Sequence, residues 1–240
     1  MREPNVERPL TIVAGNVVLS GDLTLPKGAE GLVVFVHGSG SSRFSSRNRH
    51  VAAVFAEAGL ATLLMDLLTA SEEVEDERTG RLRFNIPLLA DWVVATLDWL
   101  GTETELAGLR VGCFGASTGA AAALIAAAQR PARVHAVVSR GGRPDLAGEH
   151  LQSVRAPALL IVGGADLVVL ELNESAYREL RCVKRLAVVA GATHLFEEPG
   201  ALDRVALLAR EWFSRHLSGS PSPNGSTRTT GSRETRTTLN

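Results

Sequence analysis

The sequence has little cysteine, almost no net charge and no long apolar run. Its 240 residues include two cysteines, Cys113 and Cys182, which lie far apart in the chain and are too few for a disulfide framework. No apolar run approaches the length of a membrane-spanning helix, and residues 1–10 are polar and carry no signal segment. We therefore expect a cytoplasmic protein that does not enter a membrane.

Further partner classes are excluded by the charge and by missing ligand motifs. The formal net charge of -1 gives no overall argument for nucleic acid or a membrane surface as a partner. No cluster has metal-ligand spacing, and no glycine-rich loop carries the lysine of a P-loop. We expect neither a metal nor a nucleotide or other cofactor. The oligomeric state is not indicated by the sequence.

The composition divides the chain into a body and a tail. Hydrophobic residues make up 45% of the chain, which is ample for the core of one large α/β domain or two small ones. From residue 218 onward Ser, Thr, Gly, Pro, Asn and Arg dominate, and such a segment cannot bury enough apolar surface to order itself. We expect one folded domain over residues 1–217 and a disordered tail over residues 218–240.

Within the body, short apolar runs that predict strands alternate with segments that predict helices. The predicted strands are 31–36, 61–65, 109–114, 134–139, 158–162 and 185–189. The predicted helices are 48–58, 86–100, 120–128, 171–180 and 201–216. This alternation is typical of the α/β class with one doubly wound, mostly parallel sheet. Residues 11–25 predict an antiparallel hairpin on one edge of the sheet. Residues 71–83 begin acidic and end basic, and predict a solvated loop or short cap that could border a site.

Residues 115–119 read Gly-Ala-Ser-Thr-Gly and fit the pattern G-x-S-x-G. They stand between a predicted strand and an alanine-rich predicted helix. A reversal from strand to helix in so few residues forces the central Ser117 into a strained backbone conformation and requires glycine two positions to either side. The strain would hold the Ser117 hydroxyl above the sheet at a helix N-terminus. Because a bare G-x-S-x-G also arises by chance, the partners of Ser117 decide its meaning.

Candidate partners follow other predicted strands. In an open parallel sheet, reactive groups gather at the carboxyl ends of the strands. Ser117, Asp166 and His194 fall there in the chain order nucleophile, acid, base. Asp166 could instead cap the following turn, and His135 and His150 compete with His194 for the role of base. Neither competitor follows the last predicted strand, which favours His194.

Four segments together carry a family resemblance. They are residues 35–43 (FVHGSGSSR), 115–119 (GASTG), 163–166 (GGAD) and 191–200 (GATHLFEEPG). Over residues 6–217 the chain resembles a bacterial branch of the α/β-hydrolase superfamily that is similar to dienelactone hydrolases. Members of that branch are sometimes joined to a phosphoribosyltransferase domain. Dienelactone hydrolases proper use a cysteine nucleophile where this chain has Ser117, so their substrate is not carried over.

The resemblance and the chemistry of the residues assign the same roles. Ser117 would attack a carbonyl carbon, His194 would take and later return the proton, and Asp166 would orient the imidazole. Backbone N–H groups of Ser39 and Thr118 would form the oxyanion hole. The histidine of the H-G-x-G loop, residue 37, usually supports that loop in the family and does not react.

Arginines near the predicted mouth are the one clue to the substrate. Arg43 follows the oxyanion loop, and Arg140 and Arg143 follow the strand predicted at residues 134–139. In one interpretation these side chains face solvent. In the other they clamp a carboxylate or phosphate of an anionic substrate, because guanidinium binds such groups bidentately.

The predicted protein is a serine hydrolase with the α/β-hydrolase fold and little or no cap, because residues 139–158 leave no room for a large one. It would cleave a small ester or related acyl substrate through an acyl-enzyme on Ser117. Two alternatives stay open. The chain could be a catalytically silent binding module acting with a partner such as a phosphoribosyltransferase, or an acyltransferase that uses the same three residues. Fold does not supply the substrate.

Overall fold

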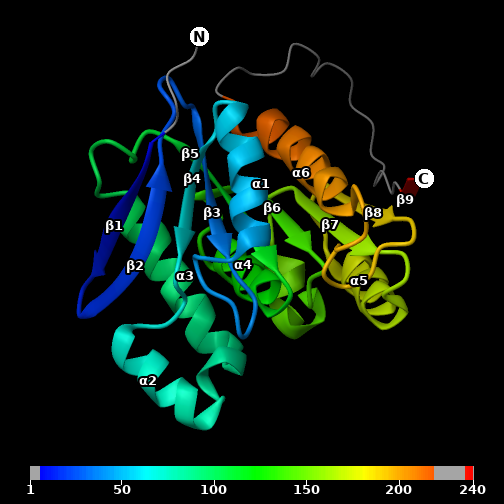
Figure 1. Ribbon diagram of the computed structural model, residues 1–240, viewed down its shortest axis with the longest axis horizontal. Helices are drawn as coiled ribbons and strands as arrows, with labels where there is room; N and C mark the ends of the chain where they lie inside the picture. Colours follow the sequence, from blue (N-terminus) through cyan, green and yellow to red (C-terminus); the bar gives the residue numbers. More distant parts are fainter. Residues whose placement is uncertain (1–5, 219–235, 240) are drawn as a thin grey trace.

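The computed structural model describes residues 6–218 and 236–239, and one sheet organises them (Figure 1). The strands are β1 (Glu7–Ala14), β2 (Val17–Thr24), β3 (Gly31–Val36), β4 (Ala61–Met65), β5 (Arg110–Ala116), β6 (Val134–Arg140), β7 (Ala158–Gly163), β8 (Lys184–Val189) and β9 (Arg236–Leu239). They lie in the order β1-β2-β4-β3-β5-β6-β7-β8-β9. Strand β2 is antiparallel to both β1 and β4, and all other neighbours are parallel. The predicted sheet with its hairpin at one edge is confirmed.

Helices cover both faces of this sheet (Figure 1). They are α1 (Ser46–Glu57), α2 (Ala70–Thr79), α3 (Ile86–Leu100), α4 (Thr118–Gln129), α5 (Leu167–Glu179) and α6 (Ala201–Leu217), with the short 3-10 segments η1 (Leu82–Phe84) and η2 (Pro144–Ser153). Helices α1 and α6 pack on one face, and α3, α4 and α5 pack on the other. Each face of the sheet therefore has its own apolar core, and the strands between them are buried on both sides.

The two cores are filled in different ways. On one face, residues 120–127 of α4 are buried, and six of these eight are alanine, so this helix lies close to the sheet and to α3. On the other face, four phenylalanines from β3, α1, β5 and α6 pack together, with ring centroids 5.0 to 5.9 Å apart: Phe35, Phe55, Phe114 and Phe213. Small residues bring α4 near the carboxyl end of β5, and large ones anchor α1 and α6.

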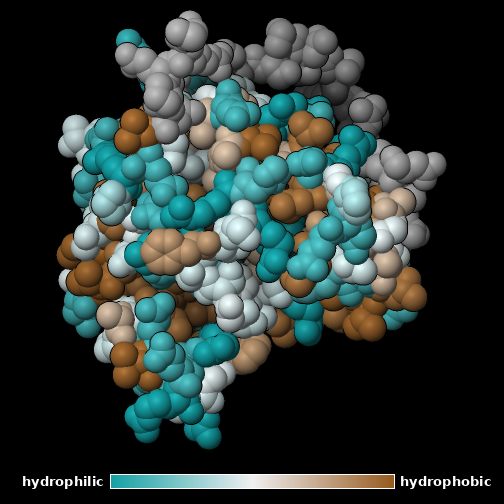
Figure 2. Space-filling model, viewed as in Figure 1, coloured by the Kyte–Doolittle hydropathy of each residue, from teal (hydrophilic) through white to brown (hydrophobic). Residues whose placement is uncertain are grey.

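The segment predicted as a solvated loop or short cap, residues 71–83, is mostly helical. Thr69 and Glu72 form a capping box at the start of α2, and Gly80 ends the helix with a left-handed φ of 63°. These signals start and stop a helix whatever its surface polarity. Figure 2 shows hydrophilic side chains gathered over this projecting part of the molecule. The loop prediction was wrong because the helix carries acidic side chains instead of an apolar stripe.

Most of the tail predicted to be disordered lies outside the described residues. Residues 219–235 and 240 belong to that part, while residues 236–239 form β9 at the exposed edge of β8. The composition of the tail does not predict this strand, although an unpaired sheet edge is a template for any added segment. Within the described ranges, no helix is long and apolar enough to cross a bilayer.

The phenylalanine cluster generates a stability prediction. Phe213 is fully buried and its ring contacts Phe55 at a centroid distance of 5.6 Å. We expect Phe213→Ala to lower the free energy of unfolding by about 3 kcal/mol or more, because it leaves a cavity in the core. Urea denaturation measures this, with Leu207→Ala on the exposed side of the same helix as the matched control. A loss below about 1 kcal/mol for Phe213→Ala would contradict the packing described.

Candidate active site

Ser117 occupies a strained turn between β5 and α4. Its backbone angles are φ 50° and ψ -124°, in a region that side chains other than glycine rarely adopt. A Cβ placed on Gly115 would lie 2.4 Å from the Cα of Ala120, and one placed on Gly119 would lie 2.2 Å from the carbonyl oxygen of His37. Only glycine fits at either position. The close approach that the G-x-S-x-G pattern predicts is therefore present.

Asp166 and His194 meet at the same edge of the sheet. Asp166 follows β7, and its Oδ2 lies 2.7 Å from Nδ1 of His194, in the loop between β8 and α6. The competing interpretation, in which Asp166 caps the following helix, is not observed, because its side chain makes no capping hydrogen bond to α5. This contact leaves the Nε2 atom of His194 for another partner.

The other two histidines considered as bases lie elsewhere. His135 is at the start of β6, near the amino ends of the parallel strands and away from Ser117. Its Nδ1 is 3.0 Å from the carbonyl oxygen of Arg133. His150 lies in η2, with its Nδ1 3.2 Å from the carbonyl oxygen of Ala147. Both rings interact locally.

The segment after β6 connects Ser117 to His194. The Ser117 N–H donates to the carbonyl of Arg140 at 3.3 Å, and the Arg143 N–H donates to the carbonyl of Ser117 at 3.0 Å. A Cβ on Gly141 would lie 3.7 Å from Nδ1 of His194. Residues 140–143 therefore lie next to both Ser117 and His194. The Ser117 hydroxyl itself makes no hydrogen bond to His194 within residues 6–218.

The loop after β3 lies against Ser117. A Cβ on Gly38 would lie 2.9 Å from the Cβ of Ser117 and 3.7 Å from its Oγ. His37 is buried: its Nδ1 lies 2.9 Å from the carbonyl of Gly38, and its Nε2 accepts from the Leu67 N–H at 3.3 Å. Burial lowers the pKa of His37, which keeps the ring neutral. As expected from the resemblance, this histidine supports the loop.

The two predicted oxyanion donors differ in their present partners. The Ser39 N–H donates to Oγ1 of Thr118 at 2.9 Å. The backbone N–H of Thr118 is in the first turn of α4, and none of the described residues accepts a hydrogen bond from it. One donor is therefore free, and the other is held by a side chain next to Ser117.

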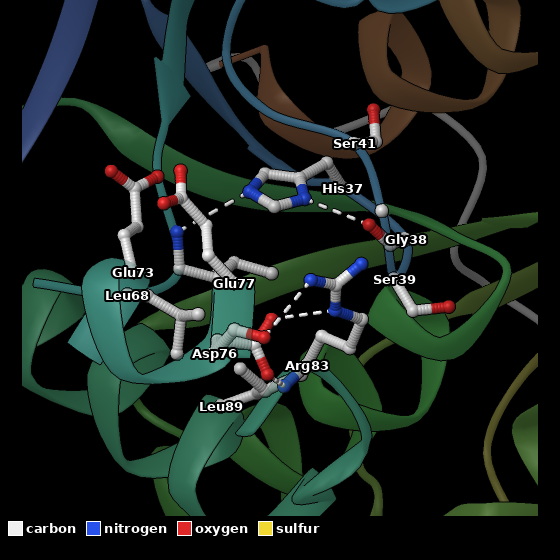
Figure 3. A pocket seen from close by; sticks show the side chains of 12 residues that line it. His37, Gly38, Ser39, Ser41, Leu68, Glu73, Asp76, Glu77, Arg83 and Leu89 are labelled. Carbon is white, nitrogen blue, oxygen red and sulfur yellow. Dashed lines mark hydrogen bonds and ion pairs between the residues drawn. The ribbon is translucent and has the colours of Figure 1, made fainter. Parts of the chain in front are cut away.

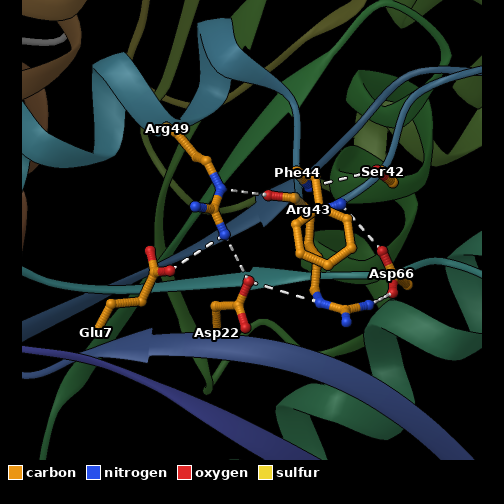
Figure 4. A network of polar contacts seen from close by, with 7 residues as sticks. All are labelled: Glu7, Asp22, Ser42, Arg43, Phe44, Arg49 and Asp66. Carbon is orange, nitrogen blue, oxygen red and sulfur yellow. Dashed lines mark hydrogen bonds and ion pairs between the residues drawn. The ribbon is translucent and has the colours of Figure 1, made fainter.

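Arg43 holds the oxyanion loop, the segment after β3 that contains Ser39, against β2 and the end of β4 (Figure 4). Its guanidinium forms an ion pair with Asp66 and lies 3.5 Å from Asp22, and its backbone N–H donates to Oδ1 of Asp66 at 2.9 Å. Arg49 extends this network, with its Nη2 2.9 Å from Asp22 and 3.1 Å from Glu7. The charge of Arg43 is thus already paired within the protein.

The other two arginines considered as substrate clamps have different surroundings. Arg143 makes a bidentate pair with Asp145, at 2.9 and 2.8 Å. Arg140 is 7% exposed and donates to Oδ1 of Asn48 at 3.1 Å. Burial, with a smaller effect of the neighbouring Arg47, lowers the pKa of Arg140 to about 10.

Neither cysteine is suited to attack a substrate. Cys113 is fully buried within β5, and burial raises its pKa to about 12. Burial also raises the pKa of Cys182. The thiolate is the nucleophilic form of cysteine, so burial disfavours the reactive form of both thiols. Over residues 6–218 and 236–239, no group of His, Cys, Asp and Glu side chains is arranged to hold a metal ion.

A cavity of about 280 Å³ opens beside the oxyanion loop (Figure 3). It is lined by residues 37–41 on one side and by α2 and η1 on the other. The sequence indicates that residues 71–83 could border a site, but a predicted loop does not specify which of its side chains share a face. The helical spacing of Glu73 and Glu77 was the signal that could have identified them.

Comparisons with known proteins agree with this architecture. The model of the dienelactone hydrolase family matches residues 19–216. The crystal structure of a dienelactone hydrolase from Anabaena variabilis is similar, with 56% identity, a TM-score of 0.88 and coverage of 89% of this chain and 99% of that one. An esterase from Pyrococcus furiosus, at 18% identity and a TM-score of 0.72, covers 89% of this chain and 94% of its own. The latter likeness concerns the fold alone.

Two curated relatives carry the name of a transferase and not of a hydrolase. Two sequences from strains of Mycobacterium tuberculosis, each provisionally named a phosphoribosyl transferase, are 56% identical over 222 residues. The match covers 92% of this chain and 49% of each relative. The chain therefore spans about half the length of the curated relatives it matches.

The strain at Ser117 generates a prediction that is independent of activity. Glycine adopts its backbone angles without steric cost, so we expect Ser117→Gly to be about 1 kcal/mol more stable than Ser117→Ala. At the exposed Ser214 within α6, the order should reverse, because glycine weakens a helix interior. Chemical denaturation of the four variants tests this. Ser117→Ala matching or exceeding Ser117→Gly in stability would show that the turn is not strained.

Proposed function

The chain belongs to the dienelactone hydrolase family, and on that premise we propose that it is a serine hydrolase that cleaves a small ester through an acyl-enzyme on Ser117. The hydrogen bond of 2.7 Å between Asp166 and His194 carries the proposal. It holds the imidazole so that Nε2 is available as a base, at the sheet edge where the strained turn presents Ser117. The raised pKa values of both thiols disfavour the cysteine chemistry of dienelactone hydrolases proper.

In the proposed first half-reaction, Oγ of Ser117 attacks the carbonyl carbon of the ester and its proton passes to Nε2 of His194. Asp166 stabilises the imidazolium that results. The tetrahedral intermediate then collapses, the ester C–O bond breaks, and the leaving alcohol takes the proton from His194. In the second half, water loses a proton to His194 and attacks the acyl carbon. The bond from that carbon to Oγ of Ser117 then breaks, Oγ takes the proton back from His194, and the acid is released.

The proposed mechanism requires a hydrogen bond between the Ser117 hydroxyl and His194. Ser117 makes no hydrogen bond to His194 in the described structure, and such contacts often tighten only when substrate binds. The Thr118 N–H is free to donate to the oxyanion. The Ser39 N–H would exchange the Thr118 hydroxyl for the oxyanion as charge develops, which favours the transition state over the substrate.

A second function deserves a test because the longer relatives carry a phosphoribosyl transferase name. This chain could be a silent binding module that serves such a partner, or it could transfer the acyl group to an acceptor other than water. Against the silent module, the hydrogen-bonded Asp166 and His194 and the strained Ser117 serve no evident packing purpose.

The proposal predicts a large loss of activity on removal of one hydroxyl. With p-nitrophenyl acetate we expect a burst of p-nitrophenol equal to the enzyme concentration, and a fall in kcat of about 10⁶-fold for Ser117→Ala. Asp166→Asn should lower kcat by about 10⁴-fold, because it removes the group that orients the imidazole. Stopped-flow absorbance measures both effects.

Ser214→Ala, far from the site on α6, is the control and should keep the wild-type rate. A broad ester panel on which the wild-type protein and Ser117→Ala behave alike would reject the hydrolase and favour the binding module. Turnover only in the presence of an added amine or thiol acceptor would indicate acyl transfer.

A further inference from the structure

The cavity beside the oxyanion loop has apolar and acidic side chains together on the wall that faces this loop (Figure 3). Leu67, Leu68 and Leu89 line it between β4 and α3, and Ser39 belongs to its opposite wall. Because Ser39 is also a proposed oxyanion donor, the cavity adjoins the proposed position of the substrate carbonyl, although Ser117 and His194 are not among its lining residues. Its volume of about 280 Å³ suits a small group, since sites for drug-sized ligands begin near this size.

One pair of charges in the cavity wall is neutralised internally. Asp76 is buried, and its Oδ2 lies 2.5 Å from Nε of Arg83. Its Oδ1 accepts hydrogen bonds from the backbone N–H groups of Leu82 and Arg83, at 2.7 and 3.1 Å. This ion pair fastens η1 to α2 and leaves no net charge for a ligand.

Glu73 and Glu77 are different, because neither carboxylate has a hydrogen-bond or ion-pair partner in the described part of the chain. They lie one turn apart on α2, and Figure 3 shows both carboxylates directed toward the His37 side of the cavity. Like charges at this spacing destabilise a helix, and both side chains are exposed.

The groups nearest these carboxylates that could carry a positive charge are neutral or paired with other carboxylates. His37 is held neutral, and Arg43 forms its ion pairs with Asp66 and Asp22. The pKa of Glu73 is raised, first by partial burial and then by the negative charge of Asp66; Arg43 opposes this rise and Glu77 adds to it. The wall opposite the oxyanion loop thus carries two glutamates that form no ion pair within the described residues.

We propose that this cavity receives a positively charged group of the substrate, such as a primary or quaternary ammonium, joined to the ester by a short apolar linker. Glu73 and Glu77 would bind the cation, and the three leucines would contact the linker. The inference rests on the proposed hydrolase function. It differs from the anionic substrate considered from the sequence, since Arg43 and Arg143 are already paired with carboxylates.

Three matched esters test the proposal. They are the p-nitrophenyl ester of γ-trimethylammonio butyrate, its uncharged isostere with tert-butyl in place of trimethylammonium, and the mono-p-nitrophenyl ester of glutarate. We expect kcat/KM to be about tenfold higher for the cation than for the isostere, mostly through KM, and lowest for the anion. The preference should shrink as salt is added.

Charge-removing variants assign the preference to the two glutamates. Glu73→Gln and Glu77→Gln together should bring the cation and the isostere to within about twofold of each other. Glu75→Gln removes the same charge from α2 at a position outside the cavity lining, and should keep the wild-type preference. Equal rates for the cation and the isostere in the wild-type protein would overturn the proposal, as would a preference for the anion or a double variant that still prefers the cation.

A binding measurement separates this inference from the proposed function. The amide of γ-trimethylammonio butyrate and its tert-butyl isostere are not cleaved, so calorimetry can compare them on Ser117→Ala protein. If no ester is turned over but the cationic amide binds about tenfold tighter than the isostere, and loses that advantage in Glu73→Gln/Glu77→Gln, the hydrolase proposal fails and the cation site stands. If esters are turned over and both amides bind alike, the reverse holds.

Discussion

The close packing of α4 against the ends of β3 and β5 is the constraint on which the site depends. No side chain fits at Gly115 or Gly119, where a Cβ would lie 2.4 Å from Ala120 or 2.2 Å from the carbonyl of His37. The alanines that follow let the helix stay at that distance from the sheet. Ser117 is therefore held at a φ of 50°, and its side chain lies against Gly38. Strain of this kind persists only where surrounding packing enforces it, which here is the core itself.

Polar contacts hold the loops around Ser117 in place. Loops that follow β3, β6, β7 and β8 converge on Ser117 because parallel strands end at one edge. Two contacts fix the loop after β3: the pair between Arg43 and Asp66, and the donation from the Leu67 N–H to His37. Asp166 fixes His194 from the other side. The side chains proposed to react are thus held in place by neighbouring residues, which is how a site keeps its geometry without substrate.

Much of this arrangement was predictable from the sequence, and the failures have physical causes. Buried strands such as 31–36 and 61–65 have their observed bounds, because continuous apolar runs between turn residues leave little choice. Helix α2 was missed since its start and stop depend on Thr69, Glu72 and Gly80, and not on an apolar stripe. The partners of Arg43 and Arg143 were also missed. An ion pair between residues distant in sequence, as between Arg43 and Asp22, leaves no local pattern. The pair of Arg143 with Asp145, two residues away, could have been predicted from the sequence.

The central claim is that the hydroxyl on this strained turn is the nucleophile and that His194 activates it. Reaction with a fluorophosphonate, followed by mass spectrometry of the digested protein, tests it most directly. The account predicts a single phosphonyl group on the peptide that contains Ser117, and much slower labelling in His194→Gln. Labelling at another residue, or labelling of Ser117 at the same rate without His194, would contradict it.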